Sequence, residues 1–237
     1  MTDAAPYADV AQRLAQVHAR IEAARARAGA DAVRLVAVGK HHRAPAIAAA
    51  YAAGQRDFGE NYAQELADKR AALASACPEL RWHVIGPVQR NKAKLVVGTA
   101  LVHTVDRVPL LAALDHQALS LGVTQPVLVQ VNVAGEASKS GVAPAELPAL
   151  LDAFADCGAL RCVGLMTMPP AGPAESARPH FRALRQLRDR LASTARPQVE
   201  LRELSMGMSD DLEVAIEEGA TLVRVGTAIF GARAVPA

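Results

Sequence analysis

Residues 33–39 read Val-Arg-Leu-Val-Ala-Val-Gly, and Lys40 follows them directly. An apolar run of this length, rich in Val and Leu, is typical of a buried strand in a parallel sheet. The residue after such a strand lies at the carboxyl edge of the sheet, where α/β proteins build their ligand sites. A lysine that loses solvent there becomes a nucleophilic amine, able to form a Schiff base with an aldehyde. Lys40 is therefore our first candidate for chemistry, and a solvated loop lysine is the alternative.

Further apolar runs alternate with helical patterns on the C-terminal side of this stretch. Eight runs are expected to form strands, at residues 33–38, 56–59, 81–85, 101–105, 127–133, 161–166, 199–204 and 222–225. Seven helical stretches lie between them, at residues 45–53, 62–76, 91–97, 109–121, 144–157, 177–194 and 211–218. One more helix precedes the first strand, because apolar residues recur at helical spacing from Val10 to Ile21.

Eight strands separated by helices predict one α/β domain over residues 1–237, folded as a closed (β/α)8 TIM barrel with an extra N-terminal helix. No linker rich in Gly, Ser or Pro interrupts the alternation, which favours a single domain. An open, doubly wound sheet is the alternative, because a strand count taken from one sequence is easily wrong by one.

The composition is that of an ordinary globular protein, since 51% of the residues are hydrophobic and 21% are charged. The net charge of +2 is spread along the chain, so no nucleic-acid partner is expected. No membrane partner is expected either, because no apolar run is long enough to span a bilayer. Three cysteines without a CxxC pair, and an N-terminus unlike a signal peptide, predict a cytoplasmic protein with free thiols.

A phosphate site is predicted at the last two strand ends, where barrels of this kind often hold one. Ser205 lies on the loop after the seventh predicted strand, and Gly226 and Thr227 follow the eighth. Glycine lets the backbone approach an anion closely, and hydroxyl and helix N-terminal N–H groups donate to it. The alternative is that these loops hold turn and capping residues, with Ser209 or Asp210 capping the next helix.

Arg224 is the unusual residue of the last predicted strand, because apolar residues flank it on both sides. A buried arginine needs an acceptor or an acidic partner, so it is either a structural ion pair or a donor to a ring nitrogen of the ligand. No metal site is expected, because His41 and His42 have no carboxylate or cysteine at ligand spacing.

Six blocks of sequence, in order along residues 10–233, resemble successive blocks of the pyridoxal phosphate homeostasis protein family. They read Val-Ala-Val-Gly-Lys at 36–40, Asp-Phe-Gly-Glu-Asn at 57–61, Trp-His-Val-Ile-Gly at 82–86, Asn-Val to Glu-Ala-Ser-Lys-Ser-Gly at 132–141, Ser-Met-Gly-Met-Ser-Asp-Asp at 205–211 and Val-Arg-Val-Gly-Thr-Ala-Ile-Phe-Gly at 223–231. Together the blocks are specific, although none would be so alone.

The resemblance implies a barrel of the alanine racemase N-terminal-domain type that carries pyridoxal 5′-phosphate (PLP). It implies these roles: Lys40 as the Schiff-base lysine, Ser205, Gly226 and Thr227 at the phosphate, Arg224 facing the pyridine nitrogen, and Asn61 beside the ring. Family members are thought to buffer PLP and deliver it to PLP-dependent apo-enzymes, without established turnover. We therefore expect a homeostasis protein rather than an enzyme.

Two enzymatic alternatives use the same residues. The first is a low-activity PLP-dependent amino-acid racemase. A racemase of this fold takes a tyrosine from a partner chain with an extra β domain, which we expect to be absent because few residues follow Phe230. A monomer is expected for the same reason. The second alternative is a Schiff-base aldolase acting on a phosphorylated sugar. One departure is local: relatives usually read Ser-Lys-Thr around the lysine, and this chain has Gly39 and His41.

Overall fold

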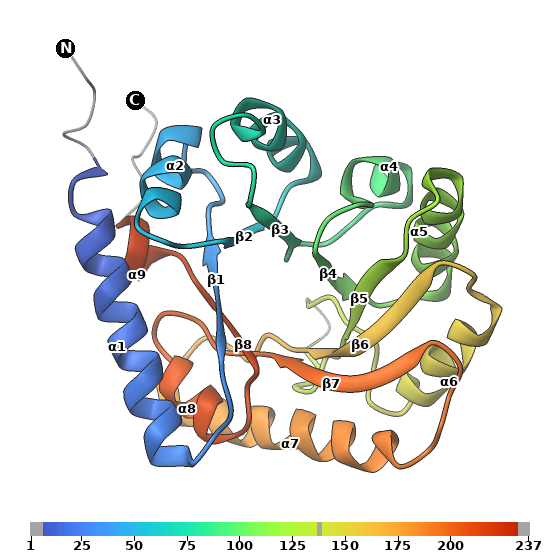
Figure 1. Cartoon of the computed structure of the whole chain (residues 1–237). Helices are drawn as coiled ribbons and strands as arrows, with labels where there is room; N and C mark the ends of the chain where they lie inside the picture. The colour runs from blue at the N-terminus through green and yellow to red at the C-terminus, as the bar shows by residue number, and fades with distance from the viewer. Residues whose placement is uncertain (1–6, 137–138, 232–237) are drawn as a thin grey trace.

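Eight parallel strands form a closed barrel in the computed structural model, which describes residues 7–136 and 139–231 (Figure 1). Each strand pairs with the next along the chain, and the eighth pairs with the first. The strands are β1 (Arg34–Val38), β2 (Asp57–Glu60), β3 (Arg81–Val84), β4 (Leu101–Val105), β5 (Gln125–Gln130), β6 (Leu160–Met166), β7 (Val199–Ser205) and β8 (Leu222–Val225). The predicted barrel is confirmed, and the open sheet is wrong. The predicted domain also included residues 1–6 and 232–237, which lie outside the described residues.

Helical segments follow the strands and form the outer layer around the barrel (Figure 1). They are α1 (Val10–Ala28), α2 (Ala44–Ala52), α3 (Ala63–Leu73), η2 (Arg90–Lys92), α4 (Ala93–Val96), α5 (Val108–Leu121), α6 (Leu147–Asp152), η3 (Ala153–Asp156), α7 (Ala174–Ala192), α8 (Leu212–Glu217) and α9 (Thr227–Phe230). No helix in the described ranges has both the length and the apolar character needed to cross a membrane.

The N-terminal helix α1 packs against α8, α9 and α2, beside the point where β1 and β8 close the barrel (Figure 1). It buries one face, because Val10, Leu14, Val17 and Ile21 recur three or four residues apart. Each such side chain contributes about 1.5–3 kcal/mol when it leaves water. The helix ends at Gly29, whose left-handed φ of 59° satisfies the last turn.

The barrel interior has an apolar part and a polar part. The apolar part is a small cluster, separate from the main core under the helices, made of Val36, Leu101, Leu128, Met166 and Leu222. Polar side chains from β2, β3, β4, β7 and β8 are also buried and bond to one another across the strands. The interior is therefore packed throughout, and space for a ligand must lie at its ends.

The fifth strand differs most from its predicted range of 127–133. It begins at Gln125, two residues earlier, and includes Pro126, which cannot donate a backbone hydrogen bond. It ends at Gln130, because the chain then folds back so that the Asn132 N–H donates to the Val142 carbonyl at 3.0 Å. The predicted helices 91–97 and 144–157 are each divided into a 3-10 segment and an α-helical segment.

Candidate functional site

A cavity of about 230 Å³ lies at the carboxyl end of the barrel. Lys40 reaches it from the loop after β1, Asn61 from the loop after β2, and Arg224 from β8 itself. Gly226 and Thr227 line it from the turn that leads from β8 into α9. The fold thus brings together five of the six residues that were predicted from the sequence to bind the cofactor.

Ser205 is the sixth predicted residue, and it does not line this cavity. It lies at the end of β7 with its side chain fully buried below the cavity. Its hydroxyl accepts a hydrogen bond from Arg224 Nη1 at 2.7 Å and lies 2.8 Å from His103 Nδ1. In this part of the chain the cavity is lined instead by Ser209, four residues further along. A phosphate role for Ser205 stays a prediction.

Arg224 lines the cavity and is buried, with 4% of its surface exposed. Its Nη1 donates to the Ser205 hydroxyl and its Nη2 donates to the Thr167 carbonyl at 3.1 Å. Burial lowers the pKa of the guanidinium to about 10, against the opposing charge of Asp211. Among the described residues its hydrogen bonds go to a hydroxyl and a carbonyl rather than to a carboxylate. This favours the ligand-donor interpretation over the structural ion pair.

The loop from Ser205 to Asp211 owes its shape to a glycine and a carboxylate. Gly207 has a φ of 91°, and a β-carbon there would lie 2.5 Å from Ala215 Cβ, so only glycine fits. Asp211 is the N-cap residue of α8, and its Oδ1 accepts a hydrogen bond from the Met208 N–H at 2.6 Å. The predicted caps were Ser209 or Asp210, so the cap lies one or two residues later than expected.

Helix α1 holds the same loop from outside. The Arg20 side chain donates from Nη2 to the Ser209 carbonyl at 2.9 Å. The same guanidinium pairs with both carboxylate oxygens of Glu213 in α8, at 2.7 and 2.9 Å. Because such bidentate pairs fix orientation, Arg20 positions the backbone beside the cavity.

A buried charged cluster lies beneath the loop that carries Lys40. Lys69 Nζ donates to the Gly39 carbonyl and to Glu60 Oε1, both at 2.8 Å, and to Glu65 Oε2 at 3.1 Å. Burial raises the pKa of Glu60 to about 7, although the Lys69 ammonium opposes the shift. Glu60 Oε2 is buried without a hydrogen-bond partner among the described residues. The cluster anchors the Lys40 loop to α3.

The departure at Gly39 has a steric reason in this structure. A β-carbon at this position would lie 2.5 Å from Ile47 Cδ1 and 2.6 Å from Glu60 Oε1. The next turn is also unusual, because His41 has a left-handed φ of 64°. The Glu65 carboxylate holds this turn by accepting a hydrogen bond from the His41 N–H at 3.1 Å. The loop is therefore built around a glycine, and a serine would require both Glu60 and Ile47 to move.

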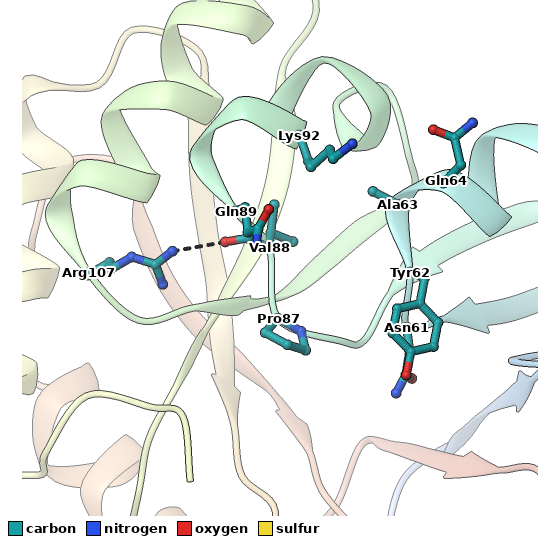
Figure 2. A pocket seen from close by; sticks show the side chains of 9 residues that line it. All are labelled: Asn61, Tyr62, Ala63, Gln64, Pro87, Val88, Gln89, Lys92 and Arg107. Atoms are coloured by element: carbon teal, nitrogen blue, oxygen red, sulfur yellow. Dashed lines mark hydrogen bonds between the residues drawn. The ribbon is translucent and has the colours of Figure 1, made fainter. Parts of the chain in front are cut away.

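A larger cavity of about 430 Å³ adjoins the first and shares Asn61 with it. Figure 2 shows Asn61 and Tyr62 on one side of this second cavity and Arg107 on the other. Arg107 Nη2 donates to the Val88 carbonyl at 2.9 Å, which fixes the loop after β3. Asn61 thus stands between the predicted cofactor cavity and an open vestibule.

Sequence reasoning missed the residues that support the site from a distance. Arg20 bonds to Ser209, Lys69 to Gly39 and His103 to Ser205, and in each of these pairs the two residues are far apart in sequence. One signal in the sequence could have found such residues, namely a polar side chain within an apolar predicted strand. His103 lies within an otherwise apolar predicted strand, where a buried imidazole requires hydrogen-bonding partners.

Comparison with known proteins agrees with this geometry. The model of the family "alanine racemase, N-terminal domain" matches residues 12–234. The pyridoxal phosphate homeostasis protein of Pseudomonas aeruginosa is 48% identical over 227 residues, covering 94% of this chain and 96% of that protein. The protein of the same name from Escherichia coli K12 is 44% identical over 229 residues, covering 95% and 97%.

A solved structure agrees as well. PipY of Synechococcus elongatus PCC7942, determined with PLP bound, is 39% identical with a TM-score of 0.82, covering 94% of this chain and all of PipY. Barrel and family model together define an alanine racemase N-terminal-domain protein. Within that class, the chain belongs to the pyridoxal phosphate homeostasis protein family.

Proposed function

We propose that this protein binds PLP through a Schiff base on Lys40 and takes part in the homeostasis of that cofactor. One observation carries the proposal: Lys40, Arg224 and the Gly226-Thr227 turn face a single cavity at the carboxyl end of the barrel. An amine, a ring-nitrogen donor and a phosphate-type turn are the three groups that PLP requires.

Each group has a defined task. The Lys40 amine joins the aldehyde carbon through a carbon–nitrogen double bond, and one water leaves. Gly226 and Thr227, with the hydroxyl of Ser209, receive the phosphate at the start of α9. Asn61, which lines the same cavity, would lie beside the ring, as the family resemblance implies.

Arg224 supports the part of the proposal that favours holding the cofactor over turnover. PLP supplies an electron sink when its ring nitrogen is protonated, usually opposite a carboxylate. Arg224 presents N–H groups in that place, and a guanidinium cannot accept a proton. With PLP bound, Arg224 would therefore disfavour protonation of the ring nitrogen and weaken the electron sink.

The absorbance spectrum tests the proposal directly. Purified protein incubated with PLP is expected to show the visible Schiff-base band, and Lys40→Ala is expected to lack it. Lys94→Ala is the matched control, because Lys94 is an exposed lysine of α4 outside the cavity. A wild type that stays colourless, or a band that survives in Lys40→Ala, contradicts the assignment.

A second candidate function is the low-activity racemase, and one observation favours it. The cavity wall includes Asp210, so a carboxylate and the Lys40 amine face the same space. The racemase would be supported if the wild type exchanged the α-proton of alanine in D₂O faster than PLP alone does. Asp210→Asn should then exchange it no faster than PLP alone. We expect no exchange above that of PLP alone.

The recipients of the cofactor follow from the same proposal. PLP-dependent apo-enzymes are the proposed recipients, and the protein is proposed to act as a monomer in the cytoplasm. The three cysteines, all buried and unpaired, suit a reducing compartment.

A further inference from the structure

A continuous chain of hydrogen bonds crosses the barrel interior below the cavity. It starts at Asp57, the first residue of β2, whose Oδ1 lies 2.9 Å from His83 Nε2. His83 Nδ1 lies 2.9 Å from His103 Nε2, and His103 Nδ1 lies 2.8 Å from the Ser205 hydroxyl. Arg224 Nη1 donates to that hydroxyl at 2.7 Å. We call these five side chains the interior chain.

The interior chain is shielded from water, and only its Asp57 end contacts an exposed side chain. His83, His103, Ser205 and Arg224 are each exposed by 4% or less. Asp57 lies at the amino end of the barrel, where it also pairs with the largely exposed Arg81. A buried polar group without a complementary partner is costly, so the donors and acceptors along the chain must match.

The two ends of the interior chain fix the direction of every bond in it. Arg224 can only donate, and the carboxylate of Asp57 can only accept. Burial opposes ionisation of Asp57, but hydrogen bonds from His83 and Arg81 lower its pKa below the usual range and keep it a carboxylate. Burial, helped by the charge of Arg224, lowers the pKa of His103 well below its usual value and keeps that imidazole neutral.

A single arrangement of protons then satisfies every link. His83 Nε2–H donates to Asp57, His103 Nε2–H donates to His83 Nδ1, and the Ser205 hydroxyl donates to His103 Nδ1. Ser205 in turn accepts from Arg224, so each bond points from the cavity toward the amino face. In the reverse arrangement His83 carries a proton on both ring nitrogens, and His103 donates from Nδ1 to Ser205. The Ser205 hydroxyl then accepts from both His103 and Arg224, so the hydroxyl proton needs a different acceptor.

We propose that Asp57, His83 and His103 are positioning residues that orient the Ser205 hydroxyl and, through it, the Arg224 guanidinium at the cavity. The inference rests on the proposed function for the identity of the ligand, PLP. It assigns Ser205 to the support of Arg224, while Ser209 and Thr227 are the hydroxyl residues that line the cavity. Among the described residues, Arg224 donates no hydrogen bond to a carboxylate. It is linked to Asp57 through the Ser205 hydroxyl and the two imidazoles.

The first experiment measures the proton positions in the protein without PLP. Two-bond ¹H–¹⁵N correlation spectra of histidine-labelled wild type at pH 8 report which ring nitrogens carry protons. We expect His83 and His103 both to be protonated on Nε2 and unprotonated on Nδ1, with the His103 signals assigned by their loss in His103→Gln. A protonated Nδ1 on either ring overturns the proposal.

The second experiment measures PLP affinity in matched variants. His103→Leu cuts the chain, and we expect it to weaken PLP binding about tenfold, because the Ser205 hydroxyl loses its acceptor. His103→Gln is expected to restore most of the affinity, since its amide nitrogen can donate to His83 while its oxygen accepts from Ser205.

The control for core damage is Leu128→Ala, which opens the apolar interior without touching the chain. Equal weakening in Leu128→Ala and His103→Leu, or wild-type affinity in His103→Leu, overturns the positioning role. If His103→Leu does not fold, the wild-type spectra still decide. Lys40→Ala separates the two proposals, because it is expected to lose the Schiff-base band and keep the histidine proton positions.

Discussion

At the scale of single residues, the chemistry of the site depends on groups packed behind it. Lys69 bonds to the Gly39 carbonyl and to Glu60, so the backbone next to Lys40 rests on a buried ion pair. The exposed fraction of the Glu60 side chain is zero, and replacing one partner of such a pair leaves the other uncompensated. The loop is therefore coupled to the protonation of a residue outside the cavity.

Replacement of Glu60 by glutamine is expected to change how stability depends on pH. The pKa of Glu60 is raised from 4.5 to about 7 in the folded protein, so the folded state binds the proton more tightly than the unfolded state. The stability that this proton contributes is fully present below pH 4.5 and is lost as the pH rises through about 7. Between pH 5 and pH 8, the free energy of unfolding of the wild type should fall by up to about 3 kcal/mol relative to that of Glu60→Gln.

Urea unfolding of both proteins at pH 5, 6, 7 and 8 measures this difference. Glu65→Gln serves as the comparison, because Glu65 also contacts Lys69 but its pKa is lowered, against its partial burial, by the His41 N–H and Lys69. A constant difference between wild type and Glu60→Gln across this pH range would show that Glu60 is ionised throughout.

At the scale of elements, helix α1 does more than cover the closing edge of the barrel. Its apolar face was predictable from the spacing of Val10, Leu14, Val17 and Ile21, because that spacing is local. Its polar contribution was not, since Arg20 and Ser209 are 189 residues apart in sequence. Strand ends were also less predictable than strand cores, as Gln125 shows, because pairing with a neighbour sets where a strand begins.

Removal of the Arg20 guanidinium is expected to weaken PLP binding by about three- to tenfold. Arg20→Ala loses the hydrogen bond to the Ser209 carbonyl and the bidentate pair with Glu213, so the loop beside the phosphate turn loses its outer support. Arg27→Ala is the matched control, because Arg27 lies in the same helix and pairs with Glu217 of the same neighbouring helix. Titrations with PLP should separate the two variants, and similar affinities would assign Arg20 a purely structural role.

At the scale of the whole molecule, the sequence was sufficient for the barrel and for the residues at its strand ends. Repeating strand and helix patterns specify the topology, and the topology brings Lys40, Arg224 and Thr227 to one rim. The interior chain was not predictable, because its members lie on five strands and become neighbours only after the barrel closes. Position in the repeat identifies residues at the rim, and it does not indicate which interior positions bond to each other.

Because the cavity draws on both β1 and β8, ligand binding is expected to stabilise the whole barrel. These strands form the closing pair, so a ligand held by the Lys40 loop and by Gly226 favours the closed state over the unfolded chain. At a PLP concentration 100 times the dissociation constant, linkage predicts about 2.7 kcal/mol of added stability. Denaturant unfolding with and without PLP measures the gain, and Lys40→Ala should lose most of it.

Pyridoxamine phosphate, which lacks the aldehyde, should give wild type and Lys40→Ala the same smaller gain. A larger gain in the wild type with that ligand would mean that Lys40 contributes chiefly by charge, and the Schiff base would then not be what joins the two strands.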